Sequence, residues 1–555
     1  MPTIDISLKD LRNLMGMQIP FKELEEEGIL YVKGEIDSFS GDELKIDCKE
    51  TNRPDLWSTE GIARQLKPYY TKERGVPKYK INTPKIEVKV EKGLKNIRPY
   101  FVAAVIKNIK ITDDLIAQIV QLQEKVCLTF GRKRKEAAIG LYDYDKLAPP
   151  LKYKPINPEG IRFKPLGFKI EMTPGEILDD HPKGQEYKHL LEKFKKYPLV
   201  IDSKNKVASL PPIINSDYTG KVTEKTKNLF VEVTGNDLNV IKIALNVMVS
   251  ALGDRGGQIE AVRIKYPDKN IITPDFKPKT MIIDKNYLQQ ISGFKLTNTK
   301  IKELLEKARY NVKFDGNKIK VEYPSYRQDI LHPIDVIEDL IISYGYNDIA
   351  PFVPEIATIG ELDEFGVFCE KVRDYMVGIG AQEILTFTLT NKEMLFEKMN
   401  TSEWSVVEIA NPISSQWAVL RNWVMPSLME FLSKNTSETY PQQIYEVGDA
   451  VIIDDKKETK TKDIKRLAWA YTGKEATFTY AKQVLNYILS ALNLDYEIVN
   501  VEHSSFIKGR AGRIIVNGKK IAYIGEVNPQ VLDNFGLKMP VTAFELNLTD
   551  LYELI

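Results

Sequence analysis

Three proline-rich stretches interrupt the regular patterns of this chain, and they limit how much of it can share one core. They read GVPKYKINTPK near residues 75–85, YPDKNIITPDFKPK near 266–279 and NDIAPFVPEI near 347–356. Such stretches separate regular elements, because proline fixes its own φ and lacks a backbone N–H. A length of 555 residues also exceeds what one hydrophobic core organises. We therefore predict four domains, at residues 1–85, 86–275, 276–352 and 353–555.

The four segments differ in their hydrophobic periodicity. The first joins a short amphipathic helix, KDLRNLMG, to strand-like runs such as ILYVKGEID, which indicates a small α+β unit. The second alternates strands with helices and indicates a mixed α/β domain. The third combines helices with a hairpin turned at Asp315-Gly316 and a helix beginning near Pro333, a winged-helix-like layout. The last pairs long helices with strands such as VTAFELNL.

Composition and missing motifs exclude several classes of protein. With 78 basic and 77 acidic residues, bulk charge gives no argument for nucleic-acid binding. Three isolated cysteines without a Cys-x-x-Cys spacing argue against a zinc site or a disulfide framework. No apolar run of about 18 residues occurs, so we expect a cytoplasmic protein without a membrane partner. Walker A, GxGxxG, HExxH and GxSxG motifs are also absent.

Four carboxylates gather around the helix expected after Pro333. Asp335, Glu338 and Asp339 stand at i, i+3 and i+4 and share one helical face, while Asp329 lies just upstream. Oxygen donors grouped in this way suit Mg²⁺. Acidic residues in a first helical turn can equally serve to complement the helix dipole. The spacing alone does not decide between these two interpretations.

Several longer motifs resemble one known family. They are TNRPDLWSTEGIAR (51–64), LPPIINS (210–216), LFVEVTGND (229–237), YRQDILHPIDVIEDLIISYGYNDI (326–349) and GEVNPQVLDNFGL (525–537). In this order they resemble the β subunit of the archaeal and eukaryotic cytosolic phenylalanyl-tRNA synthetases, over nearly the whole chain. Because the chain ends soon after residue 541, we expect no extra C-terminal anticodon-binding domain of the bacterial type.

The resemblance implies a multidomain α+β fold and a set of partners. The implied domains are an N-terminal α+β module, a mixed α/β editing domain, a winged-helix-like module and a C-terminal antiparallel-sheet domain like a class II synthetase. The implied partners are the α subunit, in an (αβ)₂ heterotetramer, and tRNA(Phe). ATP would be used at the α-subunit site. Mg²⁺, shared with the α subunit, would be held by Asp329, Asp335, Glu338 and Asp339.

The last domain shows no residues for aminoacylation. Where a class II enzyme grips the ATP phosphates with arginine, this chain reads Tyr445-Glu446-Val447-Gly448. We therefore interpret Arg421, Glu446 and Glu545 as scaffold residues and predict no catalytic residue for tRNA charging in this chain.

The resemblance also implies a site that hydrolyses tRNA(Phe) mischarged with tyrosine. An apolar pocket discriminates poorly against an added hydroxyl, so a second site is needed. Glu232 is the candidate acceptor for the phenolic hydroxyl, and Thr234 shares its face of the strand. Ser209 and Asn215 would flank a closing turn, whereas Gln123 and Arg134 would hold the terminal ribose and phosphate.

Two other functions fit parts of the same pattern. A free-standing RNA-binding or trans-editing protein would explain an editing domain, and a structural scaffold would explain a winged-helix-like module. Both predict independence from a synthetase partner. A domain without catalytic motifs argues against the first, because a free-standing editor has no use for those 200 or so residues.

Overall fold

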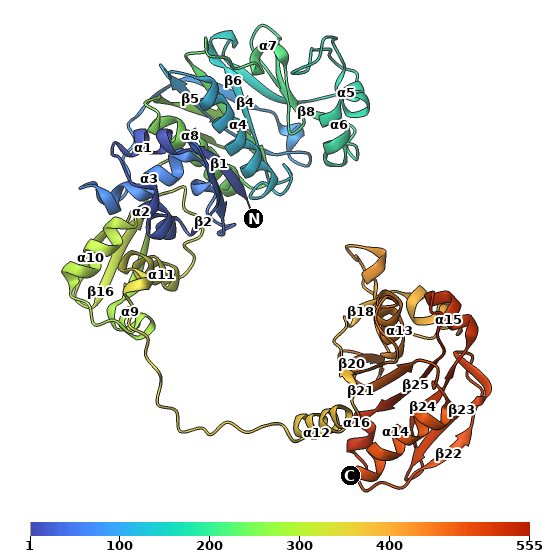
Figure 1. Cartoon of the computed structure of the whole chain (residues 1–555). Coiled ribbons are helices and arrows are strands. Elements are labelled where there is room, and N and C mark those ends of the chain that lie inside the picture. The colour runs from blue at the N-terminus through green and yellow to red at the C-terminus, as the bar shows by residue number, and fades with distance from the viewer. Residues whose placement is uncertain (1) are drawn as a thin grey trace. The chain divides into compact units, whose positions relative to one another are not determined.

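The computed structural model describes residues 2–555 and divides the chain into two compact units. The first ends at Val353, and the second runs from Pro354 to Ile555 (Figure 1). Residues 350–363 adopt neither helix nor strand. The first two proline-rich stretches lie inside the first unit and contribute residues to strands. Within residues 2–555, no helix combines the length and the apolar character that crossing a membrane requires.

The first unit begins with a small antiparallel sheet. Its strand order is β1-β3-β2, formed by β1 (Thr3–Ser7), β2 (Gly34–Ser40) and β3 (Glu43–Cys48). Helices α1 (Leu8–Met15), α2 (Phe21–Glu26) and α3 (Thr59–Tyr70) accompany it. The run ILYVKGEID, predicted as one strand, instead starts in a 3-10 helix, Gly28–Val32, and becomes a strand only at Gly34. Lys33, with φ of 54°, adopts a left-handed conformation that ends the 3-10 helix.

A ten-stranded sheet forms the centre of the first unit. Its order is β10-β9-β8-β7-β4-β12-β5-β11-β6, with β13 paired to β12. The strands are β4 (Ile81–Val90), β5 (Tyr100–Lys107), β6 (Ala137–Asp143), β7 (Leu151–Ile156), β8 (Tyr197–Ile201), β9 (Val207–Leu210), β10 (Ile214–Asn215), β11 (Leu229–Gly235), β12 (Gln258–Lys265) and β13 (Asn270–Thr273).

Both faces of this sheet are buried where the candidate residues lie. On one face, helices α4 (Asp113–Leu128) and α8 (Leu238–Asp254) pack against alternate residues of β5, β6 and β11. The intervening residues face a second core shared with β4, β7 and β12. Strand β11 is therefore buried along its whole length, which explains its nearly continuous apolar sequence. Shorter helices, α5 (Pro174–Asp180), α6 (Pro182–Tyr187) and α7 (Asp217–Gly220), lie in the connections.

The first unit ends with helices and a small sheet. The sheet order is β14-β16-β15, formed by β14 (Lys279–Asp284), β15 (Asn311–Asp315) and β16 (Lys318–Tyr323). Helices α9 (Lys285–Ser292), α10 (Asn298–Lys307) and α11 (Pro333–Tyr344) pack with it, and the predicted helix start at Pro333 is confirmed. The hairpin loop is Gly316-Asn317, one residue later than predicted, because Asp315 pairs with Lys318.

The second unit contains a seven-stranded sheet covered on both faces. Its order is β17-β20-β21-β25-β24-β23-β22, and only the β17–β20 pair is parallel. The strands are β17 (Gln382–Glu383), β20 (Gln442–Ile453), β21 (Thr461–Thr472), β22 (Glu497–Asn500), β23 (Phe506–Val516), β24 (Lys519–Val527) and β25 (Val541–Asn547). Helices α12 (Glu364–Gly378), α14 (Phe478–Ala491) and α16 (Leu548–Tyr552) share one core; α13 (Met425–Lys434) and α15 (Pro529–Phe535) share the other. The expectation of a multidomain protein mixing helices and strands is confirmed.

Candidate functional site

Strand β6 gathers predicted pocket residues that lie far apart in the sequence. Gln123 Nε2 donates to the carbonyl of Ile139 at 2.7 Å, and Asn215 Nδ2 donates to the carbonyl of Leu141 at 3.2 Å. Glu232, on β11, pairs in register with the residue between these two. Asn215 belongs to β10, the opposite end of the strand order, so the sheet curls until its ends meet at β6.

Glu232 is a buried carboxylate with only one of its two oxygens hydrogen-bonded. Its side chain is 2% exposed, and the hydroxyl of Tyr142 donates to its Oε1 at 2.8 Å. Within residues 2–555, Oε2 has no hydrogen-bond partner. Burial raises the pKa of Glu232 to about 7, although Tyr142 and Arg98 act in the opposite direction. A Cβ at Gly140 would lie 2.7 Å from Oε1, so only glycine leaves room there.

Thr234 positions a buried arginine beside this carboxylate. Arg98 Nε donates to Thr234 Oγ1 at 2.9 Å, and its Nη2 donates to the Thr234 carbonyl at 2.5 Å. Arg98 Nη1 donates to the carbonyl of Lys135 at 3.0 Å. Burial lowers the pKa of Arg98, and the charge of Glu232 acts against that shift. Thr234 therefore holds in place an arginine whose charge lowers the pKa of Glu232.

Arg134 and Ser209 lie at the turn between β9 and β10, Arg134 from the loop before β6 and Ser209 from within β9. Arg134 Nη1 donates to the carbonyls of Pro212 and Ile213 at 3.1 and 2.8 Å, and its guanidinium lies 4.3 Å from the ring centroid of Tyr187. Arg134, which was predicted to hold the terminal ribose and phosphate, thus holds the turn between β9 and β10 in this structure. Ser209 pairs with Asn215 in register and is buried, with a hydroxyl that has no partner in the described chain.

A cavity of about 250 Å³ opens on the α4 side of β6. Gln123 and Asn215 line it together with apolar side chains that include Ile119, Leu141 and Leu229. The other four predicted residues do not line it. The structure therefore groups the six residues around one strand without joining them in one open pocket.

Two of the four carboxylates predicted to hold a metal are paired with one arginine. Arg327 donates to Asp329 through Nε at 2.8 Å and through Nη2 at 2.5 Å. The same Nη2 donates to Asp339 Oδ2 at 2.8 Å, and Tyr310 donates to that oxygen at 2.6 Å. Arg327 and, more weakly, Arg53 hold the pKa of Asp329 at about 2, although burial opposes them.

The other two carboxylates also have partners of their own. Asp335 Oδ2 accepts the backbone N–H groups of Leu331 and His332, both at 2.7 Å, and so caps its own helix. Glu338 is exposed and lies 3.1 Å from Lys33 Nζ. In residues 2–555, no three His, Cys, Asp or Glu side chains converge as a metal ion needs. The four predicted ligands therefore do not fit Mg²⁺ in this chain by itself.

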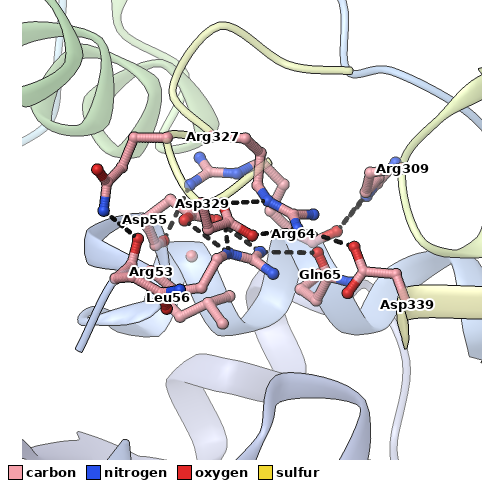
Figure 2. A network of polar contacts seen from close by, with 12 residues as sticks. Arg53, Asp55, Leu56, Arg64, Gln65, Arg309, Arg327, Asp329 and Asp339 are labelled. Carbon is pink, nitrogen blue, oxygen red and sulfur yellow. Dashed lines mark hydrogen bonds and ion pairs between the residues drawn. The ribbon is translucent and has the colours of Figure 1, made fainter. Parts of the chain in front are cut away.

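Figure 2 shows that these contacts belong to a network between two distant segments. Arg53 makes two hydrogen bonds to Asp55, at 2.9 and 2.8 Å, and both side chains are buried. From the other segment, Arg309 Nε donates to the carbonyl of Arg64 at 2.7 Å, and Gln328 donates to the carbonyl of residue 52 at 2.6 Å. The motifs at 51–64 and 326–349 thus join the N-terminal module to α11.

In the second unit, the three residues interpreted as scaffold are buried and paired. Arg421 Nη2 donates to Glu446 Oε1 at 2.7 Å, with both side chains at most 2% exposed. Glu545 Oε2 accepts the backbone N–H groups of Val424 and Met425 at 2.9 and 2.7 Å. These contacts join the start of α13 to strands β20 and β25.

Comparisons with known proteins fix the family. Successive parts of the chain match three family models: the B3/4 domain at residues 84–261, the tRNA synthetase B5 domain at 281–346, and the phenylalanyl tRNA synthetase beta chain CLM domain at 349–548. A phenylalanine–tRNA ligase beta subunit from Pyrococcus horikoshii is 50% identical over 100% of both chains. This chain belongs to the phenylalanine–tRNA ligase β-subunit family. The resemblance inferred from the sequence is confirmed.

Further relatives agree with this family. A phenylalanine–tRNA ligase beta subunit from Thermococcus sibiricus is 49% identical over 100% of this chain and 99% of its own length. Among solved structures, an N-terminal fragment of the phenylalanyl-tRNA synthetase beta subunit from Pyrococcus horikoshii matches with a TM-score of 0.61 and 47% identity. That match covers 62% of this chain and all of the fragment.

Three residues next to the candidate site escaped the sequence analysis: Arg98, Gly140 and Tyr142. Gly140 alone gave a usable signal, because a glycine inside an apolar strand often marks a close approach by another group. Nothing local distinguishes Tyr142 or Arg98, since their partners lie 90 and 136 residues away.

Proposed function

We propose that this chain is the β subunit of a cytoplasmic phenylalanine–tRNA ligase and that it hydrolyses mischarged Tyr-tRNA(Phe) around β6. In the proposed assembly, an (αβ)₂ heterotetramer, the α subunit uses ATP to charge tRNA(Phe). Residues 276–352 act as a winged-helix-like module and 353–555 as a class II synthetase-like domain without catalytic motifs. Full-length identity to proteins named as this subunit supports the assembly. The unpartnered oxygen of buried Glu232 carries the proposal of hydrolysis.

Glu232 suits the recognition of a phenol. The hydroxyl of Tyr142 already rests on Oε1 at 2.8 Å, so a tyrosyl hydroxyl is compatible with this carboxylate, and Oε2 is free to accept a second one. A phenylalanyl group would leave that buried oxygen unpaired, at a cost of about 1–3 kcal/mol. Tyrosine is then retained for hydrolysis, and phenylalanine is released.

The hydrolytic step requires an ordered water more than a strong nucleophile. None of the candidate residues forms a Ser-His or Cys-His pair, and an aminoacyl ester can be cleaved by a positioned water with stabilisation of the oxyanion. Asn215 and Gln123, which line the cavity, orient the substrate in this proposal. Neither side chain can serve as a base at neutral pH.

The test is deacylation of Tyr-tRNA(Phe) by the αβ complex carrying Glu232→Ala. We expect deacylation to slow by about tenfold to a hundredfold, which corresponds to the loss of one charge-assisted hydrogen bond. Charging with phenylalanine should change by less than about twofold, because the α subunit performs it. Glu260→Ala is the matched control, since Glu260 is equally buried, at 2% exposed, but lies on β12 and pairs with Lys85.

Two results would count against the proposal. If Glu232→Ala and Glu260→Ala slowed deacylation equally, the carboxylate would be structural and the pocket assignment wrong. If the chain were isolated without an α subunit and still hydrolysed Tyr-tRNA(Phe), the free-standing editing protein would be the better interpretation. A solitary chain without activity would favour the scaffold.

The magnesium site shared with the α subunit stays a prediction about the complex. The exposed member of the predicted set, Glu338, is the side chain that a partner subunit can most easily reach. We expect metal analysis of the αβ complex to detect Mg²⁺ that is absent from the isolated chain, and Asp335→Ala/Glu338→Ala to loosen assembly. Equal metal content in the two samples would contradict this prediction.

A further inference from the structure

The second unit contains a cavity that the proposed function does not use. It has a volume of about 740 Å³, within the range of small-molecule sites, and opens next to β21, β23, β24 and β25. All of its lining residues belong to residues 404–550. It is therefore separate from the residues grouped around β6 in the first unit.

Buried polar atoms on the wall of this cavity have no partners. Asn422 is 4% exposed, and neither its amide nitrogen nor its carbonyl oxygen has a hydrogen-bond partner in residues 2–555. The indole N–H of Trp423, in a side chain 8% exposed, also has none there. Buried polar groups are nearly always satisfied, so groups left open around a cavity point to a ligand that pairs with them.

The cavity wall also carries positive charge that the chain does not neutralise. Arg513 forms no ion pair with any carboxylate in the described chain, and its Nε has no acceptor. Lys520 likewise has no carboxylate within ion-pair distance there. Arg466, by contrast, lies 3.2 Å from Glu545. The fifth charged side chain on the wall, Asp550, pairs with Lys519 at 3.1 Å. Arg513 and Lys520 are thus left to pair with an anion such as a phosphomonoester, whose charge is about −1.5 to −2.

Aromatic rings form another side of the same cavity. The rings of Trp423 and His503 are 6.1 Å apart, and those of His503 and Tyr523 are 4.9 Å apart. The guanidinium of Arg513 lies 3.9 Å from the centroid of the Tyr523 ring. Aromatic faces suit stacking against a planar base. The amide of Asn422 can pair with the adjacent acceptor and donor on the edge of adenine.

We propose that this cavity binds an adenine nucleotide, with Asn422 on the base and with Arg513 and Lys520 on the phosphate. The aromatic side chains stack against the base. The binding requires no aminoacylation chemistry and is independent of hydrolysis around β6.

The experiment is calorimetric titration of the full-length chain with AMP, adenosine and inorganic phosphate. We expect saturable binding of AMP and at least about tenfold weaker binding of the two fragments, because each lacks half of the contacts. Photolabelling with 8-azido-AMP should modify the peptides that contain Trp423 or Tyr523. Absence of saturable AMP binding at millimolar concentration, or labelling elsewhere in the chain, would overturn the proposal.

Matched variants separate binding from folding. Arg513→Gln should weaken AMP binding at least about tenfold. Arg510→Gln, on the same strand, should leave it unchanged, because Arg510 is 60% exposed, pairs with Glu526 and does not line the cavity. Asn422→Leu should also lose binding while folding as well as the parent, since it replaces an unpaired polar group by an apolar one of similar size. Equal AMP affinity in all three variants would contradict the assignment.

Discussion

Arginines in two regions of this molecule differ in how completely acidic side chains pair with them. In the network of Figure 2, Arg327 contacts Asp329 and Asp339, and Arg53 contacts Asp55. At the cavity of the second unit, Arg513 has no carboxylate partner in the described chain. A guanidinium that pairs with carboxylates has its charge balanced within its own chain. A guanidinium without such partners can still pair with an anionic ligand.

Two buried carboxylates differ in the same way. Asp329 lies against Arg327 and keeps a low pKa, whereas Glu232 is fully buried with a phenol as its hydrogen-bond partner and has a raised pKa. The first charge is stabilised by the fold, and the second is tolerated at the expense of stability. The Figure 2 network is thus matched within the chain, whereas the proposals above assign recognition to the unmatched groups.

The largest expected effect is that of Arg327→Ala. This change leaves Asp329 and Asp339 buried without their cation, so we expect the free energy of unfolding to fall by about 3–5 kcal/mol. Denaturant unfolding of the first unit measures it. Glu338→Ala, in helix α11 next to Asp339, is the control, because its exposed ion pair contributes less than about 1 kcal/mol. Similar losses of unfolding free energy in both variants would show that the buried ion pairs of Arg327 stabilise the fold no more than an exposed ion pair does.

The next effect is a pH dependence that Glu232→Gln should abolish. The folded pKa is raised from 4.5 to about 7, so the folded state holds the proton more tightly than the unfolded state. The contribution of Glu232 to the free energy of unfolding is then highest below pH 4.5. It falls by about 3 kcal/mol as the pH rises to 7 and stays level above that pH. The measurement is the difference in unfolding free energy between the wild type and Glu232→Gln across this range.

Tyr142→Phe tests the cause of that shift. The hydrogen bond from Tyr142 lowers the pKa of Glu232, so its removal should move the end of the pH-dependent range upward. A downward movement would mean that Tyr142 favours the protonated form of Glu232 instead of the charged form.

The sequence predicted the elements better than the contacts between them. Helix α11 and its start at Pro333 followed from local signals, as did the position of Glu232 on a strand. The pairing of Asp339 with Arg327 did not, because spacing on a helix shows which carboxylates share a face but not which cations approach it. The same limit applies to Arg134, which the resemblance implies as a ligand of the terminal ribose and phosphate and which donates to the carbonyls of a turn in this structure.

A smaller effect of opposite sign is expected from Asp329. Its folded pKa is lowered from 3.8 to about 2, so its contribution of about 2 kcal/mol is fully present above pH 3.8 and is lost as the pH falls towards 2. In Asp329→Asn the side chain is an amide, which does not gain or lose a proton in this pH range. The gap in unfolding free energy between the wild type and Asp329→Asn should therefore narrow in acid, and a constant gap would show that Arg327 does not stabilise this carboxylate.

The smallest expected effect is the most informative about the cavity. Burial, together with nearby Arg466, lowers the pKa of Arg513, so the fold disfavours the charge that it carries. Removing that charge in Arg513→Gln should change the free energy of unfolding by less than about 1 kcal/mol, and either sign is compatible with a residue kept for binding. Denaturant unfolding of the second unit, without added nucleotide, measures it. A loss as large as that of Arg327→Ala would place Arg513 among the structural arginines, and the contrast between matched and unmatched charges would no longer separate folding from recognition.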